Sequence, residues 1–350
     1  MAKSNPWVVV SLTLGVLWNC TGCRARGEPK IRIGSYPAPT WGMTFADPCH
    51  LGLHGYGFSA SEKNGIVYTA RAGHIDLAHV RSSADWTKYL YNKVKTCILQ
   101  GQTDFTFTSN VEVSQYRIHI DYPDDWTDRL PAQKEPMVQD VAIDAGQYLT
   151  FTAATWHEIL TWFGYRYGGV FSEFASAFSW EDSFSNLLGT RLAAQVLTRD
   201  PTNFDRGFTA ALQQELHQLG IQSRSMALMT TKSLKGKWYS GTVPGWVTIS
   251  RRNFDIGLDD GYVTPTLMPK DITHLDDDRV SYPVPNLDRI SDLGFSIDVT
   301  IIPKEWIRHK ILRVVYPKPS SKDKVIRPDV HFAKLMKAIE QEAGLKGMKW

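Results

Sequence analysis

The chain has 350 residues, of which 43% are hydrophobic and 21% are charged, and its formal net charge is +3. This length can bury a sizeable core in one large domain or two small ones. The composition is typical of a folded globular protein and excludes a largely disordered one. A net charge so close to balance, without a basic stripe or a nucleic-acid motif, argues against nucleic acid as a partner.

The first 23 residues have the pattern of an export signal. An apolar run at residues 7–18 follows a single lysine and is too short to span a bilayer comfortably. It ends in Cys-Thr-Gly-Cys at 20–23, which resembles the bacterial lipobox, where small residues precede a cysteine that is lipidated and becomes the mature N-terminus. We therefore expect a signal peptide at 1–22 and a lipid on Cys23; an ordinary cleaved signal peptide is the alternative.

This start also predicts where the protein works. The resemblance implies a bacterial cell-envelope protein whose N-terminal lipid makes the membrane a partner. Arg24 stands where an aspartate would retain a lipoprotein at the inner membrane, so the resemblance implies the outer membrane, facing the periplasm. In an oxidising compartment, Cys49 and Cys97 become a candidate disulfide. The sequence leaves open whether their two sulfur atoms meet.

The rest of the chain divides by composition into three parts. Residues 23–40 are charged and contain prolines, as expected of a tether, and residues 41–316 carry the periodic apolar patterns of one main globular domain. Residues 317–350 predict a linker followed by a C-terminal helix. The mixture of elements predicts an α+β fold: a single domain with a core of about four helices and short attached antiparallel strands.

Apolar residues at helical spacing predict these four long helices. They cover residues 75–98, 137–165, 178–197 and 201–220, and Ser179 is the expected N-cap of the third, with Asp182 in a capping-box position. Runs of β-branched and aromatic residues predict the strands. These lie at 65–70, 103–110, 115–123, 294–303 and 311–317.

Histidines and acids on two of these helices form the candidate site. Asp76 and His79 lie three positions apart at the start of the first helix, and His157 and Glu158 are adjacent on the second, about 100° apart around its axis. Glu173 follows in the next connection. If the helices pack together, these groups could converge into a nitrogen and oxygen set suited to zinc or iron.

The roles that this arrangement suggests are those of a hydrolase. His79, His157 and Glu173 are the candidate metal ligands, Glu158 is the candidate general base, and Asp76 would orient His79. His-Glu at 157–158 begins like an HExxH zinc motif, but position 161 is threonine, which argues against that class. The structural alternative is a hydrogen-bonded His79–Asp76 pair that joins two helices.

Four segments together resemble an uncharacterised family. They are GHIDLAHVRSSADW at 73–86, WHEILTWFGY at 156–165, SAFSWEDSFSNLLGTRLA at 176–193 and DDDRVSYPVP at 276–285. The set is similar to a family of bacterial envelope lipoproteins known as domain of unknown function 4056. The resemblance implies a shared fold and an envelope location, and it implies no activity or cofactor.

Two hypotheses about function therefore remain open at this stage. The sequence favours a lipid-anchored, non-catalytic envelope lipoprotein that binds a partner, with the aromatic-rich segment 236–257 as its binding face. The alternative is a periplasm-facing hydrolase, metal-dependent or not, that acts on envelope lipids, glycans or peptides. An open pocket that gathers the histidines and acids would favour the enzyme. Side chains satisfied by backbone groups would favour the binding protein.

Overall fold

The structure is a computed structural model, and the expected signal peptide and Cys23 lie outside the residues that it describes. These are residues 27–39, 43–57, 61–167, 171–241, 247–318, 320 and 324–348. Within them, no helix is both long enough and apolar enough to cross a membrane.

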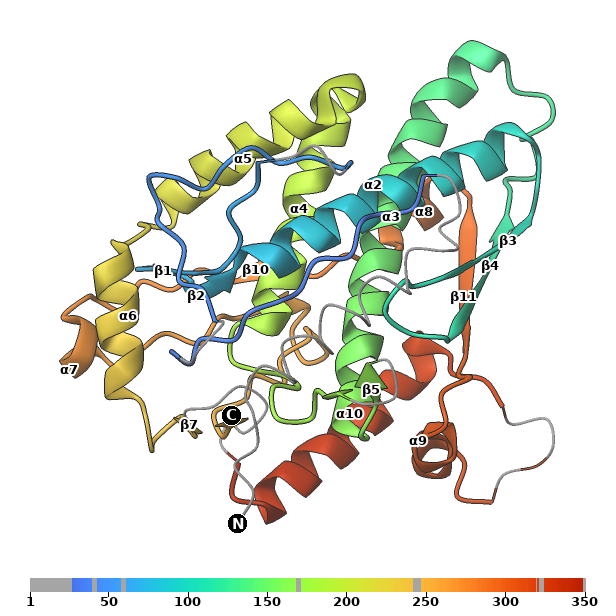
Figure 1. The fold of residues 1–350 in the computed structure, drawn as a ribbon. Helices are drawn as coiled ribbons and strands as arrows, with labels where there is room; N and C mark the ends of the chain where they lie inside the picture. The colour runs from blue at the N-terminus through green and yellow to red at the C-terminus, as the bar shows by residue number, and fades with distance from the viewer. Residues whose placement is uncertain are drawn as a thin grey trace, which may run out of the picture.

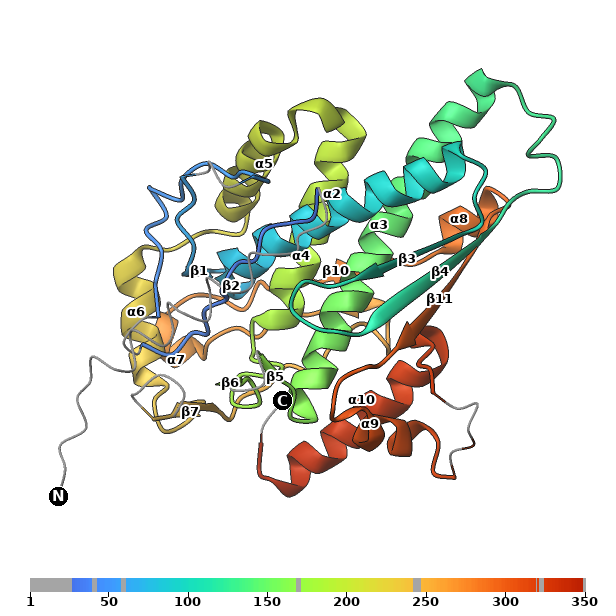
Figure 2. The same ribbon diagram turned by 45° about the vertical axis from the view of Figure 1, so that its right-hand side comes forward.

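Four helices form the centre of the molecule, as predicted. They are α2 (Leu77–Leu99), α3 (Pro131–Trp162), α4 (Asp182–Arg199) and α5 (Phe204–Gln218). The first, α2, packs against both α3 and α4; α3 also contacts α4, and α5 covers the far side of α4 (Figure 1; Figure 2). Small antiparallel sheets are attached around this core, so the predicted α+β fold is confirmed.

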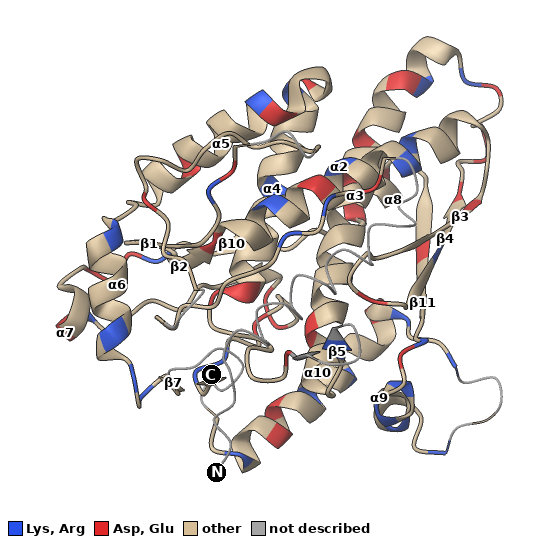
Figure 3. Cartoon of the chain, in the orientation of Figure 1, with Lys and Arg blue, Asp and Glu red and all other residues tan. Residues whose placement is uncertain are grey.

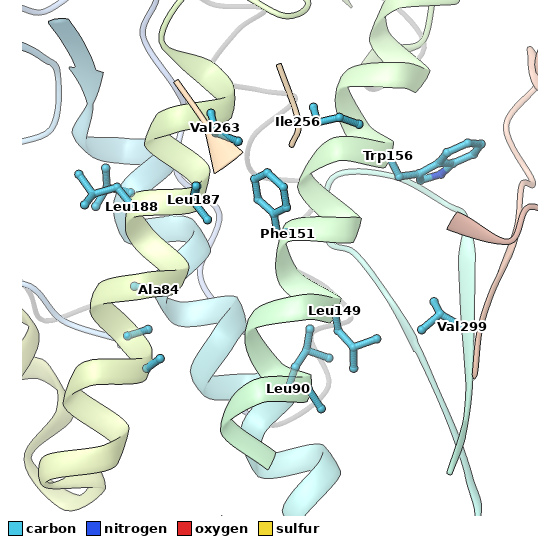
Figure 4. Close-up of a cluster of buried hydrophobic side chains, with 14 of the residues drawn as sticks. Ala84, Leu90, Leu149, Phe151, Trp156, Leu187, Leu188, Ile256, Val263 and Val299 are labelled. Carbon is cyan, nitrogen blue, oxygen red and sulfur yellow. The ribbon is translucent and has the colours of Figure 1, made fainter. Parts of the chain in front are cut away.

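The three innermost helices approach one another closely because each contact contains small or aliphatic side chains. Figure 4 shows Ala84 of α2, Leu149 of α3 and Leu187 of α4 in this core, and all three are at most 1% exposed. Gly146 of α3 marks the closest approach to α2, since a Cβ atom there would lie 2.9 Å from the Thr87 carbonyl oxygen. Side chains at such positions would hold the helices apart.

A hairpin leads into α2 and was only half predicted. Strand β1 (Ile66–Thr69) lies within the predicted strand, whereas β2 (Gly73–Asp76) occupies residues expected to be a loop and the first turn of a helix. The turn between them needs Gly73, whose φ is +65°. Because β2 ends at Asp76 and α2 begins at Leu77, Asp76 is both the last strand residue and the N-cap of the helix.

The largest sheet has three antiparallel strands, all of them predicted. The order is β11 (Ser296–Ile302), β4 (Gln115–Asp121), β3 (Asp104–Thr108), and Ile118 in the centre pairs with Val299 on one side and Phe105 on the other. Alternate residues of β4 are buried, which orients one face of the sheet toward the helices.

The C-terminal segment contains two helices, of which the sequence predicted one. Residues 311–317 were expected to be a strand but mostly lie in α9 (Arg308–Val315); this prediction was wrong because Ile307, Ile311 and Val315 repeat at the helical spacing of four and are buried. The last helix, α10 (Pro328–Leu345), packs on α9 and α3, where Phe332 stacks on Trp156.

The remaining elements are short. They are β5 (Arg166–Tyr167), β6 (Phe171–Ser172), a 3-10 helix (Pro201–Asn203), α6 (Arg224–Ser233), β7 (Tyr239–Ser240), β8 (Thr248–Ile249), β9 (Tyr262–Val263), α7 (Lys270–Thr273), β10 (Tyr282–Pro283) and α8 (Asp288–Asp292).

Cys49 and Cys97 do not form the candidate disulfide in the structure. Both thiols are free; Cys49 is exposed, and Cys97 is buried with its thiol donating to the carbonyl oxygen of Gln102. The loop that carries Cys49 is held beside Arg81 in the second turn of α2, since Arg81 donates to the Leu51 carbonyl. Cys97 lies sixteen positions further along that helix, a rise of about 24 Å.

Candidate functional site

His79 lies between two carboxylates at the point where three elements meet. It belongs to the first turn of α2, Asp76 ends β2, and Asp182 begins α4. The His79 Nδ1 atom is 3.2 Å from Oδ2 of Asp76 and 3.5 Å from Oδ1 of Asp182. The imidazole is 31% exposed, whereas the Asp76 side chain is fully buried, so one edge of a solvent-reachable ring rests against buried acids.

Asp76 is held in place by backbone groups. Its Oδ1 atom accepts from the Ala78 N–H at 2.9 Å, which caps α2, and its Oδ2 atom accepts from the Ser35 N–H at 2.7 Å. Burial raises the pKa of Asp76, and the charge of His79 and these N–H donors oppose the rise. Asp76 and His79 therefore lie close together, but the hydrogen bonds of Asp76 go to backbone N–H groups, which the sequence did not indicate, and His79 Nδ1 forms none.

Asp182 has the helix-start role predicted for it and also faces His79, although the position of the helix start was predicted wrongly. The N-cap of α4 is Glu181, not Ser179, but the Asp182 Oδ2 atom accepts from the Ser179 N–H at 2.7 Å, as half of a capping box would. Its other oxygen faces His79. Burial raises the pKa of Asp182 to about 7, and the charge of Asp76 adds to the rise.

Two further buried acids lie within electrostatic reach of Asp182. Glu158, from α3, is 8% exposed and accepts from the Phe178 N–H at 2.7 Å; burial and the charge of Asp182 raise its pKa to about 7. Glu181 is 1% exposed, and burial with the charge of Asp182 raises its pKa well above the usual range. We call Asp76, Glu158, Glu181 and Asp182 the carboxyl cluster.

The backbone next to the cluster is strained. Phe178, whose N–H binds Glu158, has φ +52°, a left-handed conformation that a bulky residue rarely adopts. Such a conformation persists only where the surroundings enforce it, and it is frequent near functional sites. Here it aims the Phe178 N–H into the cluster.

One buried arginine supplies positive charge to the cluster. The Arg252 guanidinium donates to the carbonyl oxygens of Phe174, Ala175 and Ala177. Burial lowers its pKa to about 10, although the charges of Asp182, Glu158 and Glu181 oppose the fall, so Arg252 stays protonated at neutral pH. Arg252, together with Arg81, whose charge acts on Asp76, cannot balance four carboxylates, and for this reason part of the cluster holds protons near neutral pH.

His157, the neighbour of Glu158 on α3, belongs to a second group on a different side of that helix. Its Nδ1 atom is 3.5 Å from Oε2 of Glu112, and its Nε2 atom is 3.6 Å from Oε2 of Glu173. Burial lowers the pKa of His157, but the contact with Glu112 and the charges of both acids outweigh this and raise it to about 10. We therefore describe His157 as a protonated cation.

The predicted convergence of one ligand set is replaced by two separate groups. His157 and Glu173 do meet, but His79 pairs with Asp76 and Asp182 instead. In the part of the chain that the structure describes, no three His, Cys, Asp or Glu side chains are arranged as a metal site. The reason lies in the register of α3, which directs His157 toward Glu112 and Glu158 toward α4.

The sequence missed several members of these groups. Glu112 precedes β4, Glu181 and Asp182 start α4, and Arg252 lies beyond β8, each far along the chain from Asp76. Asp182 was singled out only as a helix-start residue. No local pattern marks Glu112, Glu181 or Arg252, since their proximity depends on how the helices pack.

An N-terminal strap, residues 28–35, covers the site and runs alongside α2 (Figure 1). A Cβ atom on Gly34 would lie 2.8 Å from the His79 Nε2 atom, so the strap backbone rests on the ring. Arg32 fastens the strap, with nitrogens 2.7 Å from Asp85 and 2.8 Å from Glu62. The opposite side of the cluster is closed as well: a cavity of about 10 Å³ beside Glu158 fits about one water molecule.

Comparison with known proteins places the chain in a family. Residues 45–269, more than half of the chain, match the family described as Protein of unknown function (DUF4056). The chain belongs to this family. All members of the carboxyl cluster, with His79 and Arg252, lie inside the matched region, whereas the strap, β11, α9 and α10 lie outside it. No curated protein and no solved structure matches the chain.

Proposed function

We propose that this DUF4056 protein is a lipid-anchored envelope hydrolase that uses His79 as its general acid and base. The observation that carries the proposal is the geometry at His79, a partly exposed imidazole whose Nδ1 atom lies within 3.5 Å of two buried carboxylates. Nδ1 forms no hydrogen bond in the structure, so the proposal takes the proton to lie on Nδ1, attracted by the two carboxylates, and Nε2 to be the nitrogen that exchanges protons. Titratable groups with strongly shifted pKa values gather at catalytic sites more than elsewhere.

The reaction needs only water as a second reactant. Nε2 of His79 accepts a proton from water while the resulting hydroxide attacks the carbonyl carbon of an acyl ester or amide. The same nitrogen then returns that proton to the leaving alcohol or amine as its bond to carbon breaks. Asp76 and Asp182 orient the ring and offset its transient positive charge. Because Gly34 rests against Nε2, the strap must shift to admit a substrate.

In this scheme the carboxyl cluster does not touch the substrate and affects the reaction through the charge and orientation of His79. Glu158 and Asp182, each with a pKa of about 7, can change protonation near neutral pH as the charge on His79 changes. In the described part of the chain the cavity beside Glu158 is about 10 Å³, too small for a substrate, so the proposal gives the general-base role expected of Glu158 to His79. Glu158 becomes a positioning residue.

A non-catalytic envelope lipoprotein is the second candidate, and it meets the criterion set in the sequence analysis, because the buried acids bind backbone groups. Asp76, Glu158 and Asp182 each accept a backbone N–H bond, so the cluster ties β2, the start of α4 and the strap together. Such bonds stabilise a fold without any chemistry. The two candidate functions predict different effects of removing the His79 imidazole on hydrolytic activity.

The test is a hydrolysis assay with matched histidine variants. The chain from Arg24 onward, which contains every described residue, is assayed with chromogenic acyl esters and amides. We expect His79→Gln to lower kcat/KM by about 10²- to 10⁴-fold while the circular dichroism spectrum is retained. His119→Gln is the control, since His119 also lies between two aspartates, 2.9 Å from Asp104 and 3.1 Å from Asp121, but on the exposed surface of β4.

A separate measurement tests whether the carboxyl cluster positions His79 for catalysis. Asp182→Asn should shift the pH dependence of kcat, which a merely structural role would leave in place. The enzyme hypothesis would be rejected in favour of the non-catalytic candidate by either of two results. One is full activity of His79→Gln, and the other is no hydrolysis of any probe by the folded wild-type chain. Elemental analysis of the same samples tests the zinc or iron that the sequence suggested, with His157→Ala as its variant.

The lipid anchor is tested separately. Growth with a clickable palmitate analogue should label the full chain, and Cys23→Ser should abolish the label while Cys20→Ser keeps it. Labelling that survives Cys23→Ser would remove Cys23 as the acylated residue. Fractionation of the labelled cells then reports whether the protein follows the outer membrane.

A further inference from the structure

The outer face of α9 combines strong positive charge with an exposed indole. The patch, which we call the α9 patch, consists of Lys304, Trp306, Arg308, Lys310, Arg313 and Lys318, all of them exposed. Trp306 is 55% exposed. The opposite face carries Ile307, Ile311 and Val315, which are buried against the protein. The eight-residue helix thus packs on the protein by its apolar side, and its exposed cations form the patch together with Lys304 and Trp306 just before it and Lys318 just after it.

The charge is concentrated there to an unusual degree. Residues 304–318 contain five cations and one acid, a net charge of +4, whereas the whole chain is +3, so the other residues together carry −1. The one acid, Glu305, is 2% exposed and accepts hydrogen bonds from Ser114 and the Val113 N–H. Figure 3 shows the resulting concentration of basic residues on α9, at the edge of the molecule.

Among the residues that the structure describes, neighbouring acids leave most of this charge uncompensated. Glu342 of α10 is close enough to Lys310 for their charges to interact, but it forms its own ion pair with Lys346 at 2.6 Å. The Lys310 ammonium lies 5.7 Å from the centre of the Trp306 ring, so cation and indole form one surface. Val113, 53% exposed, adds an apolar side chain near the start of the helix.

We propose that the α9 patch docks on an anionic lipid surface. A basic helix with an exposed tryptophan suits the boundary between headgroups and acyl chains, because the cations meet lipid phosphates while the indole enters the interface. A nucleic acid would need a longer basic stripe, and the remainder of the chain is not basic. The proposal concerns α9 alone and does not depend on the lipid at Cys23 or on the activity proposed above.

The experiment measures vesicle binding by the chain from Arg24 onward, which carries no lipid. Sedimentation is compared for vesicles of phosphatidylcholine alone and for vesicles with one third phosphatidylglycerol. We expect binding only to the anionic vesicles, weakened by salt. Each cation near an anionic surface contributes about fivefold to partitioning, so Arg308→Ser/Lys310→Ser/Arg313→Ser should lower it by about 100-fold.

Two further variants distinguish binding by the α9 patch from a general effect of net charge, and the contribution of its indole from that of its cations. Lys232→Ser/Lys235→Ser/Lys237→Ser removes the same charge from exposed positions at the end of α6 and should leave binding unchanged. Trp306→Ser should weaken binding equally at low and high salt, since the indole contribution is not screened. Equal losses in the two triple variants, no preference for the anionic vesicles, or equally strong binding to a DNA duplex would each overturn the proposal.

Discussion

Gly189 of α4 lies directly against the backbone of Val80 in α2. A Cβ atom at position 189 would come within 2.2 Å of the Val80 carbonyl oxygen and 2.9 Å of the Ser83 Cβ atom. This contact fixes the spacing between the helix that carries His79 and the helix that begins at Asp182. The distance between those two side chains therefore depends on a residue with no side chain of its own.

Gly189→Ala should destabilise the protein by about 2 kcal/mol, although alanine favours a helix more than glycine does. The obstacle is backbone, which cannot rotate away. The control is Gly207→Ala in α5, whose Cβ would meet only the Val196 side chain, at 2.8 Å. Urea unfolding measures both, and an equal cost for the two variants would contradict the close contact.

Arg32→Met should be costly because it removes the arginine shared by Asp85 and Glu62 and leaves these acids only His54 and Lys30. Asp85 is fully buried, and Glu62 is nearly so; Arg32, with His54, holds the pKa of Glu62 well below its usual range in spite of burial. Breaking a buried pair costs about 3 kcal/mol. Arg279→Met removes an exposed pair with Asp277 and should cost less than about 1 kcal/mol. Similar unfolding midpoints for the two variants would show that Arg32 does not fasten the strap.

Most of the elements predicted correctly have a pattern that is local and long, and the four-residue β1 is an exception. The helices α2 to α5 and the strands β3, β4 and β11 each repeat apolar residues over enough positions to fix their type. By contrast, β2 has only four residues, and α9 is short and rich in valine and isoleucine, which favour strands. In both segments, packing against the rest of the protein determined the secondary structure in place of the local sequence preference.

The site was predicted in parts for a similar reason. Asp76 and His79 are neighbours within one turn, so their pairing follows from sequence spacing, as does the adjacency of His157 and Glu158. Asp182 meets His79 only because Gly189 lets α4 approach α2, and no spacing in the sequence contains that information. His157 and Glu158 are adjacent on α3 and point about 100° apart, so they belong to two separate groups of polar side chains.

The His157 group should make stability depend on pH above neutrality. A histidine whose folded pKa is about 10 stabilises the protein fully below its unfolded value near 6.5, and this contribution is lost as the pH rises through 10. With a side chain that is 23% exposed, we expect a loss of about 2 kcal/mol. Urea unfolding between pH 6 and 10 should show this loss in the wild type and in exposed His217→Gln, but not in His157→Gln. Parallel profiles for all three proteins would contradict the charged His157.

The carboxyl cluster should affect stability at lower pH, with a sign that can be derived. The folded pKa of Asp182 is about 7, above its unfolded value of 3.8, so its contribution is fully present below pH 3.8 and is lost as the pH rises to about 7. Asp182→Asn keeps an oxygen for the Ser179 N–H and cannot ionise. At pH 8 it should therefore be more stable than the wild type by about 2 kcal/mol, and at pH 4 it should be equal.

The control for this prediction is exposed Asp292→Asn in α8, which should match the wild type at both pH values. Urea unfolding at pH 4 and pH 8 measures the three proteins. Greater stability of Asp182→Asn at pH 8, combined with a loss of turnover, would mean that the protein keeps a destabilising acid for its chemistry. A variant that is less stable than the wild type at both pH values would instead show that the Asp182 carboxylate is needed to hold α4 in place.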